Sequence, residues 1–327
     1  MQLFREQENK YLKIEDYIDK ANNILLATHQ SPDGDAIGSL CAMMDYLSLK
    51  NKKYIAFSED DISPNFLFLR NAHRIISDKA KLARENFDLA IILDCSSLGY
   101  TNIGNYMQER KNGGDKIDLI TIDHHSGNQG YGDFNLVDGR AASTTVLLSK
   151  LFEVTGIEIK KETATAMLLG ILADTGGFTN KATNSEAMEI TSRLIGRSGK
   201  YNYIIRQIFQ DKDEQSLKIW SKVLSRLIKN DKLNIAYSVV LADDIMQDNR
   251  ASVDGISNFF NNLGDVSMSM VLKEQEGNKI KVSLRGIKEG TNVLRLARFF
   301  QGGGHVKSAG FMINGRLEKV GRYWQVV

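Results

Sequence analysis

Three short apolar segments, each with the composition of a buried β-strand, end directly at residues of the kind that bind metal ions. These segments are residues 23–28, 88–93 and 118–122. The polar residues that follow them are, in order, His29, Asp33, Asp35, Asp94, Asp123, His124 and His125. In an open parallel sheet, ligands bind outside the carboxyl ends of the strands. The pattern therefore predicts a parallel sheet with one polar site along that edge.

Strand and helix patterns alternate through the first part of the chain. A first helix is predicted over 11–20 and a further strand over 53–57, and helices are predicted between the strands at 36–49, 63–70 and 101–110. Such alternation is typical of βαβ units, in which helices cover both faces of a parallel sheet. The expected fold class is α/β.

Helical patterns replace strands from residue 142 onward, over 142–154, 161–174, 184–196, 200–209 and 213–229. Strands return at 233–240, 266–273 and 279–284, with helices near 252–263 and 292–300. The small polar segment 196–200 interrupts the helical region and favours a domain boundary near 197–213, with domain closure as a hypothesis. We predict three parts: a parallel-sheet domain over 1–196, a helical linker over 197–229, and a smaller α/β domain with a mixed sheet over 230–327.

The charge and cysteine content limit the partners and the compartment. The chain has 327 residues and a formal net charge of +2, so it offers no strong field to hold long nucleic acid or an anionic membrane. Cys41 and Cys95 fit reduced thiols better than a disulfide framework. The apolar run 166–173 is too short to span a bilayer, and residues 1–10 lack a signal-peptide core. These features predict a cytoplasmic protein.

A second type of evidence for metal binding is an aspartate at a helix end. The helix predicted over 161–174 ends in Asp174, ahead of Gly176 as a candidate cap, and the helix macrodipole disfavours a carboxylate there unless a cation compensates it. The candidate ligands are then His29, Asp33, Asp35, Asp94, His124 and Asp174. Mixed imidazole and carboxylate ligands suit manganese, iron, cobalt or zinc. Six ligands with four carboxylates predict two divalent ions about 3.5–4 Å apart, which can hold a hydroxide for attack on a phosphoryl group.

Four of these six residues also have a simpler interpretation. His29 and Asp33 could cap the helix that starts near residue 36, since Asp-Gly-Asp before a helix is a common capping sequence. Asp94 taken alone fits a turn at a strand end, and Asp174 taken alone is a weak signal. Their joint occurrence at strand and helix ends favours the metal site.

The same residues lie in motifs that resemble those of the DHH phosphoesterases. The motifs are Pro32–Ser39, Leu93–Asp94, Asp123–His125 and Ala173–Gly176. Three further segments resemble the DHH-associated C-terminal domain: Val282–Arg285, Gly302–His305 and Ala309–Gly310. The resemblance covers nearly the whole chain in order. It is greatest for the NrnA-type branch, whose members degrade very short RNA and dephosphorylate adenosine 3′,5′-bisphosphate.

The resemblance implies a role for each matching residue. One metal would bind His29, Asp33 and Asp94, and the other would bind Asp35, Asp94, His124 and Asp174, with manganese as the expected ion. Asp94 would bridge the two ions. His125 would face the substrate phosphate or the leaving oxygen, and Asp123 would fix a ring orientation. Ser143 and Thr144, which open a predicted helix, match a family stretch near the site and suit either an anion or a helix cap.

A glycine-rich turn in the C-terminal part suggests a second binding element. Gly302, Gly303 and Gly304 follow a predicted helix and could turn consecutive amides toward a phosphate. His305 after the turn and Arg285 at a strand end supply positive partners, and the planar fork of arginine suits phosphate. These residues predict a clamp for a nucleotide end.

The predicted function is hydrolysis of short oligoribonucleotides to 5′-mononucleotides together with dephosphorylation of adenosine 3′,5′-bisphosphate. A linear or cyclic dinucleotide phosphodiesterase is the enzymatic alternative, and a non-catalytic nucleotide- or RNA-binding regulator is the other. Gly177, Gly286 and Tyr100 depart from common family residues without removing a ligand, so they bear on substrate choice. The expected partners are short RNA or nucleotides, with no long nucleic acid and no membrane. A homodimer is compatible with this interpretation.

Overall fold

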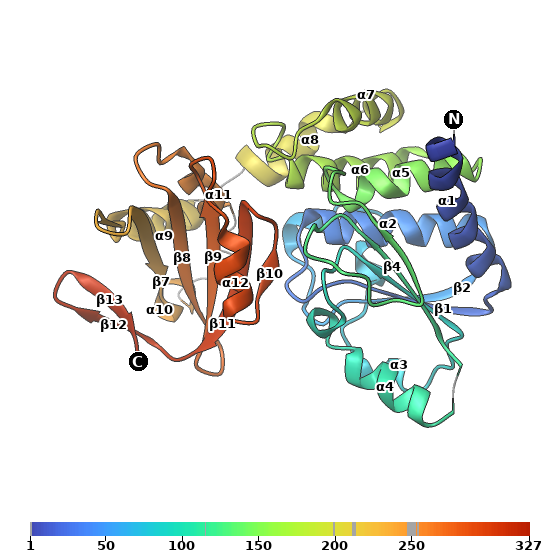
Figure 1. The fold of residues 1–327 in the computed structure, drawn as a ribbon, viewed down its shortest axis with the longest axis horizontal. Helices are drawn as coiled ribbons and strands as arrows, with labels where there is room; N and C mark the ends of the chain where they lie inside the picture. Colours follow the sequence, from blue (N-terminus) through green and yellow to red (C-terminus); the bar gives the residue numbers. More distant parts are fainter. Residues whose placement is uncertain (1, 115, 199, 211–213, 247–252, 254) are drawn as a thin grey trace. The chain divides into compact units, whose positions relative to one another are not determined.

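The computed structural model describes residues 2–114, 116–198, 200–210, 214–246, 253 and 255–327. The chain forms two compact units, Met1–Ile208 and Phe209–Val327. Figure 1 colours the first unit from blue to yellow and the second from yellow to red. The boundary between them falls inside the segment 197–229.

The first unit is built on a five-stranded sheet in the order β2-β1-β3-β4-β5, and every neighbouring pair is parallel. The strands are β1 (Asn23–Ala27), β2 (Lys53–Phe57), β3 (Leu89–Leu93), β4 (Asp118–Asp123) and β5 (Phe134–Val137). Strand β1 shows why both faces are covered. Ile24 and Leu26 point into one apolar core, and the alternate residues Leu25 and Ala27 point into the other.

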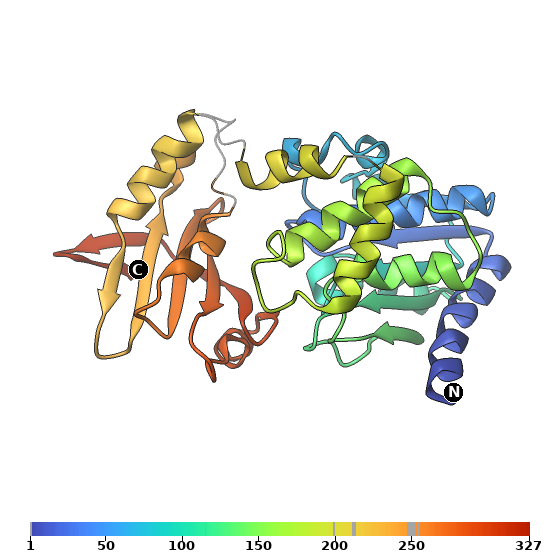
Figure 2. The same cartoon turned by 90° about the horizontal axis from the view of Figure 1, so that it is seen from above.

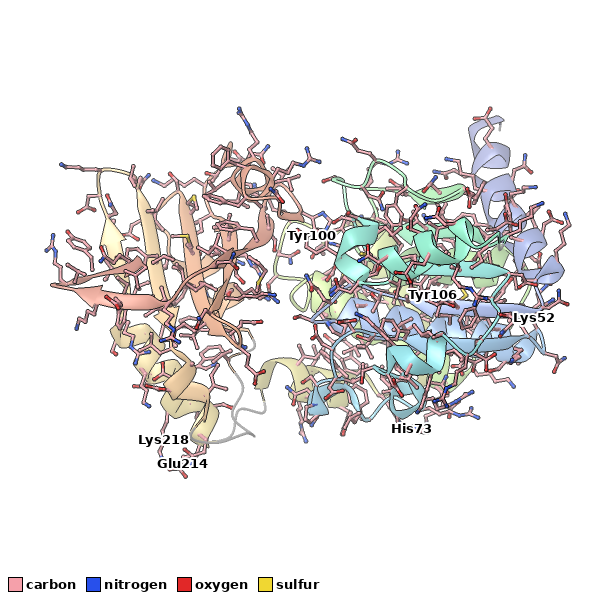
Figure 3. The ribbon with its side chains drawn as sticks, turned by 90° about the horizontal axis from the view of Figure 1, so that it is seen from below. Lys52, His73, Tyr100, Tyr106, Glu214 and Lys218 are labelled. Carbon is pink, nitrogen blue, oxygen red and sulfur yellow. The ribbon has the colours of Figure 1, made fainter. Side chains whose placement is uncertain are left out.

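Helices lie on both faces of this sheet. One core is shared with α1 (Gln2–Lys20), α2 (Gly34–Leu49), α5 (Thr144–Val154), α6 (Lys161–Asp174) and α7 (Ser185–Ser198). Seen from above, α5 to α7 lie across that face in green and yellow-green (Figure 2). The other face is covered by α3 (Lys79–Leu82) and α4 (Gly104–Asn112), where Tyr106, labelled in Figure 3, donates its hydroxyl to the Leu82 carbonyl at 3.2 Å. The predicted α/β class is confirmed.

The second unit contains a six-stranded mixed sheet in the order β10-β11-β9-β8-β7-β6. Its strands are β6 (Ile228–Asn230), β7 (Ile235–Val240), β8 (Met268–Gln275), β9 (Lys279–Gly286), β10 (Gly303–Gly304) and β11 (Ser308–Asn314). Only the β7–β8 pair is parallel among these described strands. The predicted mixed sheet is therefore confirmed.

Helices and a hairpin complete the second unit. They are α9 (Glu214–Ser225), α10 (Ala242–Met246), α11 (Ile256–Phe259), α12 (Val293–Phe299), and the hairpin β12 (Leu317–Val320) with β13 (Tyr323–Val326). Helix α12 packs Val293, Leu294 and Ala297 against the sheet residues Val282 and Phe311.

Several element boundaries differ from the sequence prediction. The helix predicted over 63–70 is instead a short 3₁₀ turn, Pro64–Phe66, and a second 3₁₀ turn, Ala72–Arg74, follows it. The helix predicted over 101–110 begins at Gly104, after a 3₁₀ turn over Leu98–Thr101. The helix predicted over 213–229 ends at Ser225, and β6 follows it.

The region predicted as helix over 252–263 contains α11 and a 3₁₀ turn, Phe260–Asn262, while residues 252 and 254 lie outside the described part. The predicted helix over 200–209 is a short α8 (Tyr201–Ile205) continued by a π-helical turn, Arg206–Gln210. Strands β5, β6 and β10 to β13 had no predicted counterpart. In the described residues, no helix has the length and apolar character needed to cross a membrane.

Candidate metal centre

The carboxyl ends of three adjacent strands lie level with one another. Leu93 at the end of β3 pairs with Ile122 of β4, and the Asp94 N–H continues the ladder by donating to the Ile122 carbonyl at 3.0 Å. On the other side, Thr28 donates its hydroxyl to the Leu93 carbonyl at 2.8 Å. These bonds hold His29, Asp94 and the Asp123–His125 segment at one edge of the sheet, as the sequence predicted.

The backbone of Asp94 is in a conformation that few side chains adopt. Its φ is +53°, in the left-handed region that favours glycine. A non-glycine residue held there costs on the order of 1–3 kcal/mol, and such residues cluster at functional sites. The residue is only 1% exposed, so this conformation turns a carboxylate into the buried centre of the cluster.

Helices α2 and α6 deliver two more carboxylates because small residues let them approach closely. A Cβ on Gly34 would lie 2.7 Å from the Cβ of Ala173, and one on Gly38 would lie 2.5 Å from the Ala166 carbonyl oxygen. A Cβ on Gly170 would lie closer than 3.0 Å to an oxygen of Asp35. The two helices are therefore close enough to bring Asp35 and Asp174 to the same site.

Asp33 has both of the roles considered from sequence. It is the N-cap of α2, and its Oδ1 accepts from the N–H groups of Asp35 and Ala36 at 3.0 and 3.1 Å. It also lies within a group of potential ligand atoms from His29, Asp33 and Asp94 that are all within 4.8 Å of one another.

His124 lies at the centre of the second group. Its Nε2 is 2.9 Å from Asp174 Oδ2, 3.5 Å from Asp94 Oδ1 and 3.8 Å from Asp35 Oδ2. His29 Nε2 lies 3.7 Å from the other oxygen of Asp94. Asp94 thus stands between two groups of candidate ligands, and all six predicted ligands are brought together.

The ring orientations of the two histidines fit metal binding. His29 Nδ1 is 2.8 Å from the Gln30 carbonyl, and His124 Nδ1 is 3.2 Å from the Ala141 carbonyl. In both cases a backbone carbonyl holds Nδ1 while Nε2 faces carboxylates. Metal-binding histidines commonly use one ring nitrogen in this way to fix the tautomer and the ring.

The electrostatics also fit a divalent cation. Burial raises the pKa of Asp35, and the charges of Asp94 and Asp174 raise it further. The pKa of Asp174 is raised by burial as well. Burial disfavours the charged form of His124, but the charge and hydrogen bond of Asp174 raise its pKa well above the usual value. Without a metal, these three groups therefore bind protons more readily than usual. A divalent ion can replace those protons as the positive charge that compensates the carboxylates.

Asp123 and His125 form a separate pair beside the ligands. His125 Nδ1 is 2.7 Å from Asp123 Oδ1 and 3.5 Å from Asp94 Oδ1. Asp123 is fully buried. Burial disfavours the charged form of His125, but the hydrogen bond and charge of Asp123 raise its pKa. Asp123 thus contacts the ring of His125, and the roles predicted for the two residues in the reaction remain predictions.

The start of helix α5 binds an anion, and this anion is a carboxylate of the protein itself. The Thr144 N–H donates to Asp35 Oδ2 at 2.6 Å, and Thr145 donates its N–H and its hydroxyl to Asp35 Oδ1 at 3.1 and 2.9 Å. Thr144 donates its hydroxyl to Asp94 at 3.1 Å, and the Ser143 hydroxyl caps the helix at Val146 N–H. The substrate contacts predicted for Ser143 and Thr144 remain a prediction, because the observed bonds serve the ligands and the helix cap. Thr145, which directly follows them, is a contact residue of the cluster that the sequence pattern does not single out.

The predicted clamp residues lie together within the second unit. Arg285 of β9 pairs with Ser308 of β11, whose carbonyl accepts from the His305 N–H at 2.6 Å. The Gly302 N–H donates to the Ala297 carbonyl at 2.7 Å, so this amide and that of His305 are used within the unit. Gly304 has a φ of +124°, a conformation that requires glycine. A phosphate clamp on these residues remains a prediction.

The fold and the site together define a class of protein. It is a two-domain α/β protein whose parallel sheet gathers carboxylates and imidazoles into a candidate metal centre at its carboxyl edge. Family descriptions agree with this class: "DHH family, N-terminal domain" matches residues 23–171, and "DHHA1 domain" matches residues 232–323. The chain belongs to the DHH family.

Individual relatives resemble the chain over most of its length. A Thermus thermophilus protein named "Bifunctional oligoribonuclease and PAP phosphatase NrnA" is 27% identical over 292 residues, which cover 89% of this chain and 84% of that protein. An exopolyphosphatase-related protein from Bacteroides fragilis has a crystal structure with a TM-score of 0.78 and 24% identity, covering 93% of this chain and 90% of that one. RecJ from Thermus thermophilus, solved with Mn²⁺, has a TM-score of 0.51 and 14% identity, covering 94% of this chain and 52% of that one. The two structural likenesses show the fold.

Proposed function

We propose that the protein is a phosphoesterase that hydrolyses short oligoribonucleotides to 5′-mononucleotides and dephosphorylates adenosine 3′,5′-bisphosphate. The observation that carries this proposal is the convergence of six imidazole and carboxylate ligands around the buried Asp94. The name of the Thermus thermophilus relative, which covers most of both chains, supports the substrate class.

The cluster would hold two divalent ions, with manganese as the proposed metal. His29, Asp33 and Asp94 would bind one ion, while Asp35, Asp94, His124 and Asp174 would bind the other. Bound divalent ions supply an activated water and neutralise charge on a phosphoryl group. The Mn²⁺ in the RecJ structure supports this choice of metal.

The protein's own residues would orient and protonate the substrate. Asp123 holds His125 through Nδ1 at 2.7 Å. A ring fixed in this way can keep a proton on Nε2 and donate it to the leaving oxygen of the ester, as a general acid. Thr144 and Thr145 would keep Asp35 fixed during the reaction, because three of their donor groups already contact it.

The second unit would bind the nucleotide end. Arg285, His305 and the backbone of Gly302, Gly303 and Gly304 would contact its phosphate. A net charge of +2 gives the chain little attraction for a long polyanion. The substrates should therefore be short. Cys41 and Cys95 are both free and buried, which supports a reducing compartment such as the cytoplasm.

The decisive experiment compares substrates side by side with Mn²⁺. The panel contains a diribonucleotide, a pentaribonucleotide, a cyclic dinucleotide, adenosine 3′,5′-bisphosphate and a long single-stranded RNA. We expect turnover of the diribonucleotide, the pentaribonucleotide and the bisphosphate, and its loss in Asp94→Ala. Processive degradation of the long RNA with no turnover of the dinucleotide would refute the proposal. Preference for the cyclic dinucleotide would instead indicate a signalling hydrolase.

A further inference from the structure

A buried asparagine that no ligand motif includes connects two strand ends at the candidate centre. Asn128 lies in the loop after β4 and is 9% exposed. Its Nδ2 donates to Asp123 Oδ2 at 2.7 Å and to the Cys95 carbonyl at 3.2 Å. Its Oδ1 accepts from the Gly130 N–H at 2.8 Å. Both amide hydrogens and the amide oxygen of this side chain therefore have partners.

The contact with the Cys95 carbonyl bears on the conformation of Asp94. Cys95 directly follows Asp94, whose φ of +53° needs restraint from its surroundings. The Cys95 carbonyl accepts a second bond, from the Tyr131 hydroxyl at 2.9 Å. Two side chains of the loop after β4 thus hold the carbonyl of Cys95, the residue next to the central carboxylate.

The contact with Asp123 bears on the orientation of His125. Asp123 accepts from Asn128 on Oδ2 and from the His125 ring on Oδ1. The Asn128 N–H also donates to the His125 carbonyl at 3.0 Å. The carboxylate plane of Asp123, and with it the ring of His125, is therefore fixed from two sides.

We propose that Asn128 is a positioning residue of the reaction: it orients the Asp123–His125 pair and anchors the carbonyl of Cys95, next to Asp94. The proposal rests on the function proposed above. Only an amide can make this set of bonds, because it carries two donors and an acceptor in one plane. Aspartate has the same shape, but it would place an oxygen where Nδ2 now lies 2.7 Å from Asp123 Oδ2.

The test uses Asn128→Ala and Asn128→Asp, with Asn135→Ala as the matched control. Asn135 lies on β5, and its side chain binds the Gly132 N–H and carbonyl at 2.9 and 2.8 Å, so these two hydrogen bonds stabilise a turn and not the ligand cluster. We expect Asn128→Ala to lower kcat for the diribonucleotide by about 10–100-fold, the usual cost of losing a partner that orients a reactive group. KM should change by less than about threefold, because the residue does not contact substrate. Asn128→Asp should be slower still, and Asn135→Ala should retain the wild-type kcat.

A second measurement separates this proposal from the proposed function. Nitrogen-15 NMR of the imidazoles detects the proton that His125 Nδ1 shares with Asp123, whether or not a substrate is turned over. We expect this proton to be protected from exchange in the wild type and in Asn135→Ala, and exposed in both Asn128 variants. Protection that persists in the Asn128 variants would overturn the proposal, as would an Asn128→Asp enzyme faster than Asn128→Ala. A wild type inactive on the whole panel would instead refute the proposed function.

Discussion

Replacing Gly170 by alanine should damage the candidate metal centre from inside helix α6. A Cβ at this position would lie closer than 3.0 Å to Asp35 Oδ1 and to Thr145 Oγ1. These two oxygens are hydrogen-bonded to each other at 2.9 Å. Asp35 and Thr145 are fully buried, so neither can move aside into solvent. The new methyl group must therefore break the bond or push α6 away from α2.

The size of the effect follows from three contributions. Overpacking a buried site costs about 1–3 kcal/mol. Loss of the hydrogen bond between Thr145 and Asp35 adds about 1 kcal/mol. The higher helix propensity of alanine stabilises the variant by about 1 kcal/mol. We expect the Gly170→Ala variant to lose about 1–3 kcal/mol in its free energy of unfolding. Because Asp35 is a candidate ligand, the affinity of the variant for Mn²⁺ should also fall by about tenfold or more.

The matched control is Gly196→Ala in helix α7. A Cβ there would meet nothing within 4 Å, so only the propensity gain of up to about 1 kcal/mol applies. Urea unfolding of the metal-free proteins gives the free energy of unfolding of both variants, and calorimetric titration with Mn²⁺ gives their metal affinity. The two glycine substitutions should change stability in opposite directions. If Gly170→Ala were as stable as Gly196→Ala and bound Mn²⁺ with wild-type affinity, the close packing inferred around Asp35 would be wrong.

Three further predictions address the ligands and the clamp. Thr145→Val removes the hydroxyl that donates to Asp35, and it should weaken Mn²⁺ binding by about tenfold in calorimetry. The control Thr155→Val removes a hydroxyl that is bonded to the Leu151 carbonyl, and it should leave Mn²⁺ affinity unchanged. Burial lowers the pKa of His29, but its bond to Asp94 and the charges of Asp33 and Asp94 raise it to about 9. The pKa of histidine in the unfolded chain is about 6.5, so the metal-free protein should lose stability as the pH rises from about 6.5 through 9. Urea unfolding in the presence of a chelator measures this, and a free energy of unfolding that does not change over this pH range would contradict the prediction. Arg285→Ala should raise KM for the diribonucleotide by about tenfold or more, with a smaller effect on kcat, if the guanidinium binds phosphate. The control Arg316→Ala, which removes an arginine with a similar bond to an asparagine, should leave KM unchanged.

The six candidate ligands could be predicted from sequence because their positions depend on simple geometry. Strands β1, β3 and β4 are short apolar segments, and parallel pairing necessarily brings their carboxyl ends to one edge. Asp174 was predicted from its place at a helix end. There Thr175 is the C-cap, and Gly176 follows in the left-handed conformation with a φ of +58°.

The supporting residues could not be predicted in the same way. The roles of Asn128, Thr145 and Gly170 depend on which side chains meet after folding, and a single asparagine, threonine or glycine gives no periodic signal. The missed strands have a comparable cause. Strand β5 is only four residues long, and β11 contains Gly310, where an added Cβ would lie 2.9 Å from the Val282 carbonyl oxygen of the neighbouring strand. The first sequence pattern is too short, and the second is too interrupted by glycine, to be recognised as a strand.

Asp33 and Ser143 each cap a helix and also take part in the candidate site or support it. In the sequence, helix capping and a role in the site are alternative interpretations of both residues. Asp33 caps α2 through Oδ1 and still lies among the candidate ligands, because the N-terminus of α2 begins at the carboxyl edge of the sheet. Ser143 caps α5, and this cap sets the two following residues, Thr144 and Thr145, against Asp35. In this fold a helix that starts above a strand end is held in place by the same polar residues that build the site. A capping motif after a buried strand is therefore evidence for a functional edge in this chain.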